Sequence, residues 1–399
     1  MISPGAAPLP PTTEVGAQQL LVVDDPDDVP EHPSGWEVVH VRDYIFGGAE
    51  RWGPSTTVWN SSRETGFLEP GFCVSHQAEA RGHVVVPSAR ALVRGAAPLT
   101  PPAPRDPGPH PTLGILYDED SIVRPCRPDT IQYICDVAAS MGVQTRVFNE
   151  SQLDAFEGCD ALFIRSATRV GNTAYRLAER AEAMGIRVID DPSSILIASN
   201  KAFQVEYFGR IGVPIPRSRL IRPGNLHDVA AEIGFPCVLK SAYGCFGREV
   251  FLIHSLEELQ ARVIERYERD ELLVLQQYVR SDFDWRIGVL NGELLFAARY
   301  NYVPGYWKSS LWQGDEQTIG HTDAVPRDQV PPLVAACALG AARATGSGLY
   351  GLDIKETDQG VFVLEINDNA DLDLDCEDAA EGEVLYQRLI DALLPGVMR

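Results

Sequence analysis

Features typical of membrane and nucleic-acid-binding proteins are missing from the sequence. No apolar run is long enough to span a bilayer, and the start, Met1-Ile2-Ser3-Pro4, lacks the basic and apolar regions of a secretion signal. Basic residues are few, since 34 Lys and Arg stand against 56 Asp and Glu for a formal net charge of -22. Such a surface repels phosphate backbones and anionic lipids. We therefore expect a cytoplasmic protein that binds neither nucleic acid nor membrane.

Lysines are also scarce, and the cysteines form no closely spaced pairs. The eight cysteines include no Cys-x-x-Cys pair, which argues against a disulfide framework and against a thiolate zinc site. Only four of the 34 basic residues are lysines, namely Lys201, Lys240, Lys308 and Lys355. A compositional bias toward arginine explains the scarcity but not the places where lysine remains. These four positions are therefore the first to consider for function.

The composition, with 45% hydrophobic and 23% charged residues, is that of a folded protein, and 399 residues allow two or three domains. Seven of the 14 residues from Pro98 to Pro111 are proline, which excludes a helix or central strand and marks a domain boundary. After it, strands alternate with helices as in a parallel α/β unit. The predicted parts are a flexible lead-in at 1–18, a first domain at 19–95, a linker at 96–111, a second domain at 112–199 and a third at 200–399.

Hydrophobic periodicity and helix-start residues locate the principal elements. The predicted strands are 20–23, 36–41, 113–117, 143–148, 161–164 and 187–189, and the predicted helices are 72–81, 130–141, 173–184 and 256–269.

The most specific pattern lies near the carboxyl end. Two apolar stretches on either side of a polar turn centred near Gln359 predict a β-hairpin. Because side chains alternate along a strand, Glu365 and Asn367 share a face, and this turn places Asp353 opposite Glu365. Facing carboxylates repel each other unless a cation lies between them, and oxygen ligands suit Mg²⁺. The alternative is a solvated hairpin face with unrelated acids.

A lysine and a glycine loop form a second pattern. Lys240 ends an apolar strand, where its ammonium is costly unless it meets an anion. The next loop carries Gly244 and Gly247, which let backbone N–H groups approach a phosphate. A Walker loop is absent, and no Gly-x-Gly-x-x-Gly follows the first strand of the α/β unit, which disfavours a dinucleotide-dependent dehydrogenase. The glycines alone also fit an ordinary hairpin turn.

A third pattern joins an apolar strand ending at 276–279 to a strand that carries Asp284 and Arg286. These two residues are two positions apart and share a face, so they present an acceptor and a fork-shaped donor to a nucleotide. The alternative is a cross-strand ion pair.

Taken in this order, the motifs resemble the ATP-grasp superfamily, and most closely its RimK-like ligases. The run Glu365-Ile366-Asn367-Asp368-Asn369 resembles the Glu-hydrophobic-Asn ending of that group. Residues 72–83 resemble the segment that marks the RimK-like amino-terminal domain fused to such enzymes. The resemblance covers about residues 20–394. It implies an α/β (α+β) ATP-grasp fold with a lid at about 214–280, a preceding small α/β domain, and an additional RimK-like amino-terminal domain.

The resemblance also implies site residues and a reaction. Arg286 and Arg299 would neutralise the transferred phosphate or an acyl phosphate. Magnesium, as two ions, or manganese in its place, would bind Asp353, Glu365 and Asn367. A carboxylate would take the γ-phosphoryl group of ATP, and an amine would then attack the acyl phosphate to give an amide, ADP and phosphate. The residues that would hold ATP are Lys201, Lys240, Gly244, Gly247, Gln276, Gln277, Tyr278, Val279 and Asp284.

The sequence leaves the substrates open. We expect a small-molecule carboxylate and an amine, from an amino acid or a peptide. One alternative is a ligase that modifies a protein tail, and another is an ATP-binding regulatory protein without activity. A homo-oligomer is compatible with the sequence. The chain departs from the family at Glu249, where related enzymes usually keep glycine, and at Gln277, where they often carry an acid.

Two further groups of residues are of interest. An acidic stretch directly follows the predicted metal ligands, and we hypothesise that it helps to receive a cationic amine, with a solvated acidic loop as the alternative. Its members are Asp371, Asp373, Asp375, Glu377 and Asp378. Composition and position alone suggest other pocket residues, for which a surface role is the alternative. They are Arg63, Arg165, Arg169, Arg248, Tyr300, Trp307 and Lys308.

Overall fold

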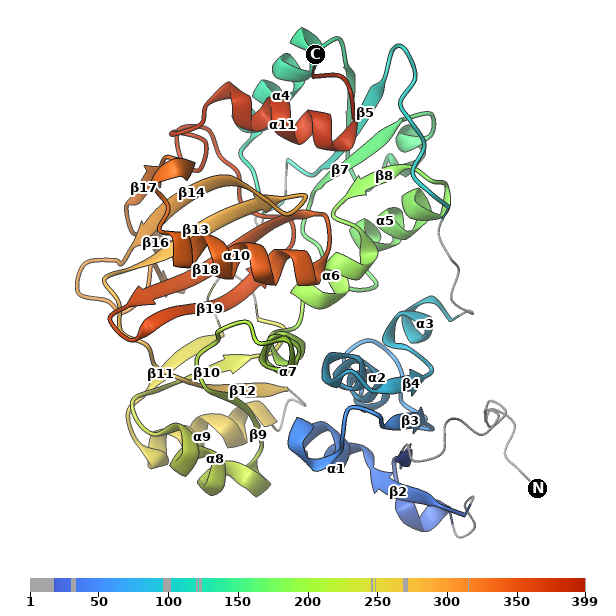
Figure 1. The fold of residues 1–399 in the computed structure, drawn as a ribbon, viewed down its shortest axis with the longest axis vertical. Coiled ribbons are helices and arrows are strands. Elements are labelled where there is room, and N and C mark those ends of the chain that lie inside the picture. The colour runs from blue at the N-terminus through green and yellow to red at the C-terminus, as the bar shows by residue number, and fades with distance from the viewer. Residues whose placement is uncertain are drawn as a thin grey trace.

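The computed structural model describes residues 18–29, 34–95, 102–119, 121, 124–244, 247, 249–267, 272–314 and 316–398. Within these residues the chain forms five β-sheets, which assemble with their helices into three α/β units (Figure 1). The predicted lead-in, apart from Gln18, lies outside the described residues. The described part of the predicted linker, residues 102–111, has neither helix nor strand, as its prolines require.

The first unit is a parallel sheet in the order β2-β1-β3-β4, covered by helices. Its elements are β1 (Gln19–Val23), η1 (Pro26–Asp28), β2 (Trp36–His40), α1 (Val41–Phe46), η2 (Ala49–Arg51), β3 (Thr57–Asn60), α2 (Pro70–Arg81), β4 (Val84–Val86) and α3 (Ala89–Arg94). The predicted strand 36–41 ends at His40 because the His40 ring accepts a hydrogen bond from the Arg42 backbone N–H and so caps α1.

The second unit repeats this topology, with parallel strands in the order β6-β5-β7-β8. Its elements are β5 (Thr112–Tyr117), α4 (Pro128–Ser140), β6 (Gln144–Phe148), η3 (Leu153–Phe156), β7 (Ala161–Arg165), α5 (Thr173–Ala183), β8 (Arg187–Ile189) and α6 (Pro192–Ala198). Asp191 starts α6 by accepting hydrogen bonds from the Ser193 and Ser194 backbone N–H groups. The predicted strands and helices of these two units are confirmed to within two residues at each end.

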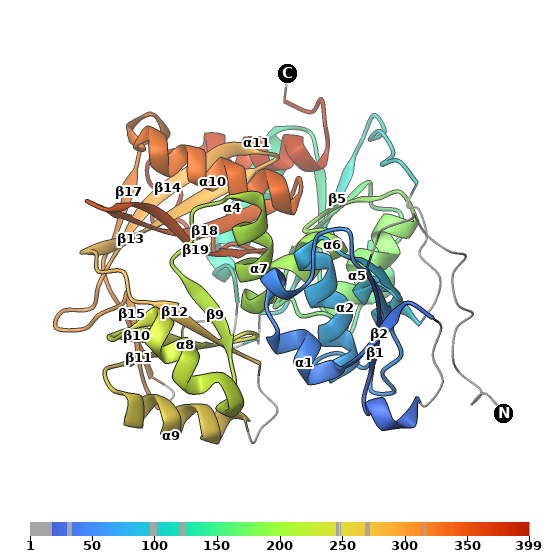
Figure 2. The same ribbon diagram turned by 60° about the horizontal axis from the view of Figure 1, so that its bottom comes forward.

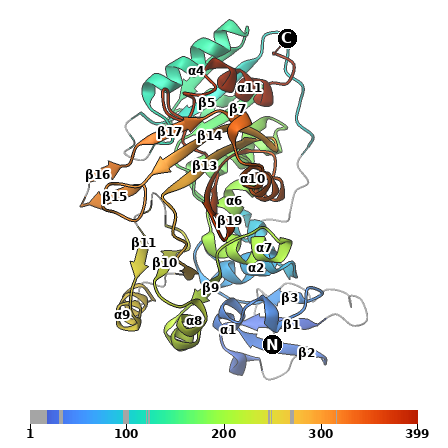
Figure 3. The same cartoon turned by 60° about the vertical axis from the view of Figure 1, so that its left-hand side comes forward.

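The third unit begins with α7 (Lys201–Ile211) and contains two main antiparallel sheets. The first, here called the small sheet, has the order β11-β10-β12-β9. It comprises β9 (Ser218–Ile221), η4 (Pro223–Asn225), α8 (Leu226–Ile233), β10 (Cys237–Ser241), β11 (Val250–Ile253), α9 (Leu256–Tyr267) and β12 (Leu273–Gln277). Helices α8 and α9 pack on one face of it, on the side away from the rest of the third unit (Figure 3).

The second sheet, here called the large sheet, has the order β17-β14-β13-β18-β19. Its strands and neighbours are β13 (Phe283–Leu290), β14 (Glu293–Asn301), β15 (Ser310–Gln313), β16 (Glu316–Ile319), β17 (Thr322–Val325), η5 (Arg327–Gln329), α10 (Pro332–Thr345), β18 (Leu349–Thr357), β19 (Gly360–Asn367) and α11 (Glu383–Leu393). Helix α10 covers one face, where Trp285, Ile287 and Leu352 pack against Val334 and Ala338 (Figure 2). The opposite face is left for the site.

Two β-bulges set which side chains reach that face. In the β18–β19 hairpin Thr357 pairs with Gly360, so an uninterrupted register would put Leu364 opposite Asp353. A register shift after Asp353 adds one residue, and Glu365 lies opposite Asp353 as predicted.

The second bulge lies in the β13–β14 hairpin. Its turn at Asn291-Gly292 pairs Leu290 with Glu293, and this register alone would place Arg299 opposite Asp284. The bulge between Gly288 and Val289 instead places Arg299 opposite Trp285. Arg299 therefore lies on the face of the large sheet that carries Trp285.

No helix in the described part of the chain combines the length and apolar character needed to cross a bilayer.

Candidate active site

Five charged side chains meet between the start of α7, the small sheet and the large sheet. The Lys201 ammonium lies 3.2 Å from Oε2 of Glu365, and Nη1 of Arg286 lies 3.2 Å from Oδ1 of Asp353. Asp353 and Glu365 face each other across the hairpin. Lys240 approaches from the small sheet, close enough for Glu365 to influence its pKa. The structure thus gathers residues that the sequence contributes from four separate segments.

Lys201 is bound to the glycine loop at two points. Helix α7 begins here because the Asn200 side chain accepts a hydrogen bond from the Phe203 backbone N–H. The Lys201 backbone N–H donates to the Ala242 carbonyl at 2.8 Å, and its ammonium donates to the Gly244 carbonyl at 2.7 Å. The lysine consequently joins the loop after β10 to the carboxylate on β19.

The Glu249 side chain lies so close to Gly244 that it determines which residue can occupy position 244. A Cβ on Gly244 would lie 2.7 Å from Cβ of Glu249, so only glycine fits beside this side chain. The Glu249 carboxylate turns away to form an ion pair with Arg266 of α9. The acid that departs from the family pattern is therefore held by the small sheet's own helix.

Lys240 is buried on β10, paired with Val250 and Val274. Burial lowers the pKa of this lysine, and Glu365 acts in the opposite direction. Glu365 is thus an anionic group that acts on this buried ammonium.

The facing carboxylates differ in their ionisation. Burial raises the pKa of Asp353 to about 7, with Arg286 opposing and Glu365 adding to the rise. Burial also acts to raise the pKa of Glu365, but Lys201 and Lys240 outweigh it and lower this pKa to about 2. Crowding of like charge beside Asp353 is a condition that a bound cation would relieve.

The oxygen donors of this hairpin fit a hard cation. Asn367 points the same way as Glu365, and its Nδ2 lies 3.4 Å from Oε1 of Glu365. Within the described ranges, no three His, Cys, Asp or Glu side chains form a group that could hold a metal. An ion here would therefore rely on the two carboxylates, the Asn367 oxygen, water and phosphate oxygens, which is a set that Mg²⁺ accepts.

Arg286 lies between two carboxylates. Besides Asp353, its Nη2 lies 3.2 Å from Oδ2 of Asp371, and its guanidinium stacks over the Tyr300 ring at 5.2 Å. The Tyr300 hydroxyl donates to Glu377 at 2.6 Å. Arg286 thus forms a cross-strand ion pair with Asp353, which was the alternative role for this arginine. The pair keeps the guanidinium in the charged cluster.

The acidic stretch is largely engaged within the chain. Asp371 pairs with Arg286, Asp373 accepts from the Arg127 backbone N–H at 2.7 Å, and Asp378 accepts from the Tyr386 hydroxyl at 3.0 Å. Glu377 and Asp378 are buried, and Asp375 is exposed. The stretch is neither a solvated loop nor a set of free acids, which weakens the hypothesis of an amine-binding role for it.

The structure does not bring Arg299 to this cluster. Its guanidinium stacks on Phe283 and Trp285, at 5.0 and 4.9 Å from the ring centres, on the face opposite to Arg286. The β13–β14 bulge is the cause, because one extra residue reverses the side on which a side chain emerges.

Asp284 is held by Lys355, which belongs to none of the three sequence patterns described above. The buried Lys355 ammonium donates to Oδ1 of Asp284 at 2.7 Å, to Oγ of Ser281 at 2.8 Å, and to the Tyr302 hydroxyl. Tyr302 also donates to Asp284 at 2.9 Å. Lys355 thus links the segment after β12 to the loop after β14. In the sequence, only the small number of lysines pointed to Lys355.

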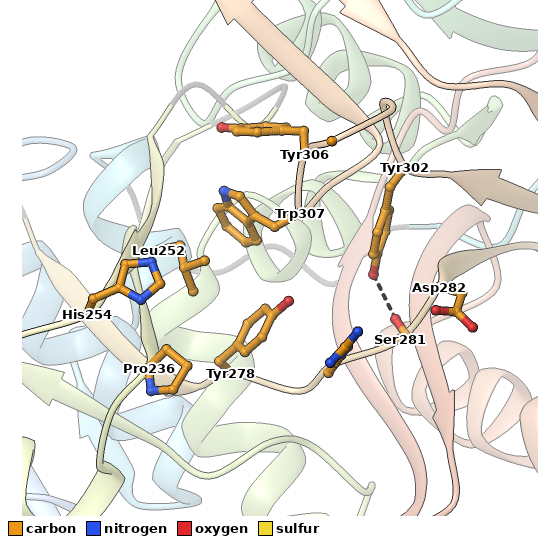
Figure 4. Close-up of a pocket in the computed structure, with 11 residues that line it drawn as sticks. Pro236, Leu252, His254, Tyr278, Ser281, Asp282, Tyr302, Tyr306 and Trp307 are labelled. Carbon is orange, nitrogen blue, oxygen red and sulfur yellow. Dashed lines mark hydrogen bonds between the residues drawn. The ribbon is translucent and has the colours of Figure 1, made fainter.

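A cavity of about 530 Å³ opens beside the segment after β12 (Figure 4). Tyr278 lines it together with Pro236 and Leu252 of the small sheet, and Tyr302 and Trp307 close it from the loop after β14. The Tyr278 and Trp307 rings meet edge to face, with centres 6.2 Å apart. Four aromatic side chains, those of Tyr278, Tyr302, Tyr306 and Trp307, thus line this space between the two sheets.

The other predicted residues of this segment have different surroundings. Gln276 is buried and donates to Oγ of Ser218 at 3.0 Å, while Oε1 of Gln277 accepts from Nε of Arg217 at 3.3 Å. Val279 is half-buried. The two glutamine side chains thus bond to β9 and to the residue before it, and of residues 276–279 it is Tyr278 that lines the cavity.

Lys308 closes the far side of the glycine loop. Its ammonium donates to the Gly247 carbonyl at 2.6 Å, and burial lowers the pKa of this lysine to about 8. Gly247 has a φ of +66°, which glycine adopts without strain. Lys201 and Lys308 therefore grip carbonyls at two ends of the same loop.

The remaining suggested pocket residues lie elsewhere. Arg165 is fully buried and donates to the Asn369 side chain and the Ala370 carbonyl, each at 2.8 Å, so it braces the loop that follows Asn367. Arg63 and Arg169 are exposed. Arg248 lies outside the described residues.

Comparisons with known proteins agree with this geometry. Residues 198–390 match the model of the RimK-like ATP-grasp domain. A protein of Maridesulfovibrio salexigens named "Probable alpha-L-glutamate ligase" is 24% identical over 268 residues, which is 65% of this chain and 85% of that protein. One of the same name from Aeromonas salmonicida is 25% identical over 243 residues, which is 59% of this chain and 78% of that protein.

Solved structures show the same fold at low identity. The D-cycloserine synthetase DcsG superposes with a TM-score of 0.54 at 18% identity, covering 71% of this chain and 99% of its own. D-alanine–D-alanine ligase from Bacillus anthracis superposes with a TM-score of 0.53 at 14% identity, covering 72% of this chain and 98% of its own.

The two sheets and the charged cluster between them therefore define an ATP-grasp protein, and the predicted α/β ATP-grasp fold is confirmed. Residues 198–390 form a RimK-like ATP-grasp domain, and the chain is a ligase that forms carbon–nitrogen bonds. It is an ATP-dependent carboxylate–amine ligase. The resemblance of residues 72–83 to the RimK-like amino-terminal domain stays a prediction, since the family match begins at residue 198.

Proposed function

We propose that this chain phosphorylates a substrate carboxylate with ATP and joins the activated acid to the amine of an amino acid or a peptide. The observation that carries the proposal is the cluster of Lys201, Lys240, Arg286, Asp353 and Glu365 between the two sheets. Cations for phosphate and carboxylates for a metal ion occur there together, in a buried place that strengthens their fields.

In this proposal the triphosphate lies between α7 and β10. Lys201 and Lys240 bind its oxygens, and the backbone N–H groups around Gly244 and Gly247 approach it. Lys308 keeps the loop closed through its bond to Gly247. The ribose lies near Asp284.

The adenine is proposed to lie beside residues 276–279, against the cavity next to Tyr278. Its flat ring suits the aromatic walls there.

Asp353, Glu365 and Asn367 would hold magnesium, or manganese in its place. The metal would neutralise charge on the phosphates as it does in other phosphoryl transfers. The chain's own contribution is to keep these oxygens together through the bulge that sets Glu365 opposite Asp353.

The proposed chemistry has two steps. A carboxylate oxygen attacks the γ-phosphorus, the bond to ADP breaks, and an acyl phosphate forms. The amine nitrogen then attacks the acyl carbon, phosphate leaves with the bonding electrons, and the nitrogen loses a proton. Arg286, oriented by Asp353 and Asp371, stabilises negative charge on the acyl phosphate.

The names of the relatives support an amino acid as one substrate, and L-glutamate is the first to test. The purified protein would be incubated with Mg-ATP and pools of carboxylic acids and amines, with L-glutamate in half of them. We expect ADP release only when an acid and an amine are both present, with a product whose mass is their sum less one water.

Two variants make this test specific. Glu365→Gln should abolish product formation, whereas Glu293→Gln should not, because that carboxylate is 75% exposed on β14 and pairs with Arg388. Release of ADP without a condensed product in any pool, or turnover that persists in Glu365→Gln, would contradict the proposal.

A further inference from the structure

The first unit contacts the helix that carries Lys201. Its helix α2 packs along α7, the helix that begins with Lys201 (Figure 2). Arg81 of α2 is fully buried and pairs with Glu206 of α7 at 3.1 Å, and Nε of Arg210 donates to the Ala80 carbonyl at 2.9 Å. The two helices are thus joined by polar contacts, of which the Arg81–Glu206 ion pair is largely buried.

Three side chains, those of His76, Asn200 and Tyr243, connect α2, the start of α7 and the glycine loop. Oδ1 of Asn200 caps α7, while its Nδ2 donates both to Nδ1 of His76 at 3.1 Å and to the Tyr243 hydroxyl at 2.9 Å. The His76 ring stacks on Phe203 with centres 4.4 Å apart. Since its Nδ1 accepts, His76 is neutral, in keeping with a pKa that burial lowers to about 3.

Tyr243 belongs to the glycine loop but lies against the first unit. Its ring meets Phe67 edge to face at 5.5 Å, and its hydroxyl lies 3.7 Å from Sγ of Cys73. On either side of it, Ala242 and Gly244 bond to Lys201. Residues 242–244 of the loop therefore bond to Asn200 and Lys201 at the start of α7. His76 of the first unit accepts a hydrogen bond from the same Asn200 amide that donates to Tyr243.

We propose that His76 and Tyr243 are positioning residues through which the first unit holds the glycine loop and Lys201 in the arrangement that binds the phosphates of ATP. This inference rests on the proposed function, which places the triphosphate at Lys201. A loop with two glycines loses much conformational entropy when it closes on a ligand. Ties that order the loop beforehand reduce this loss and tighten binding.

The test measures Mg-ATP binding by calorimetry without acid or amine, and then steady-state kinetics. Tyr243→Phe removes one acceptor of the Asn200 amide and keeps the ring, and His76→Phe removes the other and keeps the stack on Phe203. We expect each to weaken ATP binding about fivefold, which corresponds to the loss of about 1 kcal/mol for one hydrogen bond. The kcat at saturating ATP and the KM for the amine should change less than twofold.

Tyr44→Phe is the matched control. It removes a buried tyrosine hydroxyl that bonds to His83 at 2.7 Å, within the first unit and away from the loop. It should lower the melting temperature without changing ATP affinity. Because His76 and Tyr243 both act through Asn200, the double variant should lose less than the product of the two single effects.

The outcomes separate the inference from the proposed function. Folded Tyr243→Phe and His76→Phe proteins with unchanged ATP affinity would overturn the inference, and so would a Tyr44→Phe protein that weakens binding equally. Failure of the wild-type protein to bind Mg-ATP would overturn the proposed function and the inference with it.

Discussion

Replacement of Arg286 by methionine would leave two carboxylates in a buried site without their cation. The guanidinium lies 3.2 Å from Asp353 and 3.2 Å from Asp371, and the arginine is 8% exposed. At an effective dielectric constant of about 20, each contact is worth about 5 kcal/mol of Coulomb attraction. Desolvation offsets much of this, and the loss of one partner from a buried pair costs about 3–5 kcal/mol. We expect Arg286→Met to lower the free energy of unfolding by that amount.

Asp371→Asn provides the comparison. The Asp371 side chain is 39% exposed, so solvent screens its contact with Arg286, and the Arg286–Asp353 pair survives in this variant. We expect a loss of about 1 kcal/mol or less. The stability difference between the two variants therefore reports on burial and not on the count of ion pairs.

Denaturant unfolding of both variants would measure the two losses. Product formation would be followed in parallel, and Arg286→Met should lower it about 10³-fold, the scale of a cation that stabilises charge in phosphoryl transfer. Mg-ATP binding should remain. Equal destabilisation by Arg286→Met and Asp371→Asn, or turnover retained in Arg286→Met, would refute the reasoning.

Three further predictions address packing, pH and loop closure. Gly288→Ala should cost about 3 kcal/mol in denaturant unfolding, because its Cβ would lie 2.2 Å from the Phe296 ring, whereas Gly340→Ala, in an open position on α10, should cost nothing. His76 has a pKa of about 3 in the folded protein against 6.5 in the unfolded one, so the native state binds fewer protons and the free energy of unfolding falls by about 1.4 kcal/mol per pH unit below pH 6.5. His76→Phe should reduce this pH dependence in thermal melts between pH 7 and 5. An unchanged pH dependence would show that His76 does not cause it. Lys308→Met should raise the KM for ATP about tenfold, with an unchanged KM counting against its closure of the loop.

Much of the site could be predicted because it depends on local periodicity. Alternation along β13 and β19 is a property of any strand, so Asp284 with Arg286 and Glu365 with Asn367 share faces whatever the rest of the fold does. The helix start at Asn200 likewise follows from side-chain chemistry within four residues.

Register across strands could not be predicted in the same way. The pairing of Asp353 with Glu365 was correct, although a two-residue turn and a bulge produce it in place of the assumed turn centre. Arg299 shows the opposite outcome, because the β13–β14 bulge turns it to the other face. A bulge depends on how the sheet must bend to pack, for example on the room beside Gly288, and no local pattern reveals it.

Contacts between units were also out of reach. Nothing near Tyr243 in the sequence indicates that its hydroxyl meets Asn200 and lies near Cys73, since these residues come together only when the first unit packs on α7. Lys355 was visible only as one of four lysines, and its partners come from two other segments.

The packing of α2 on α7 has a consequence for synthesis on the ribosome. Helix α2 ends at Arg81 and α7 ends at Ile211, so roughly 130 residues must be added before the partner helix exists, which takes roughly 7 to 26 s at 5–20 residues per second. During this interval His76 lacks the Phe203 ring on which it stacks in the finished protein. The part of the chain that is made first thus acquires this neighbour only after half of the protein has been translated.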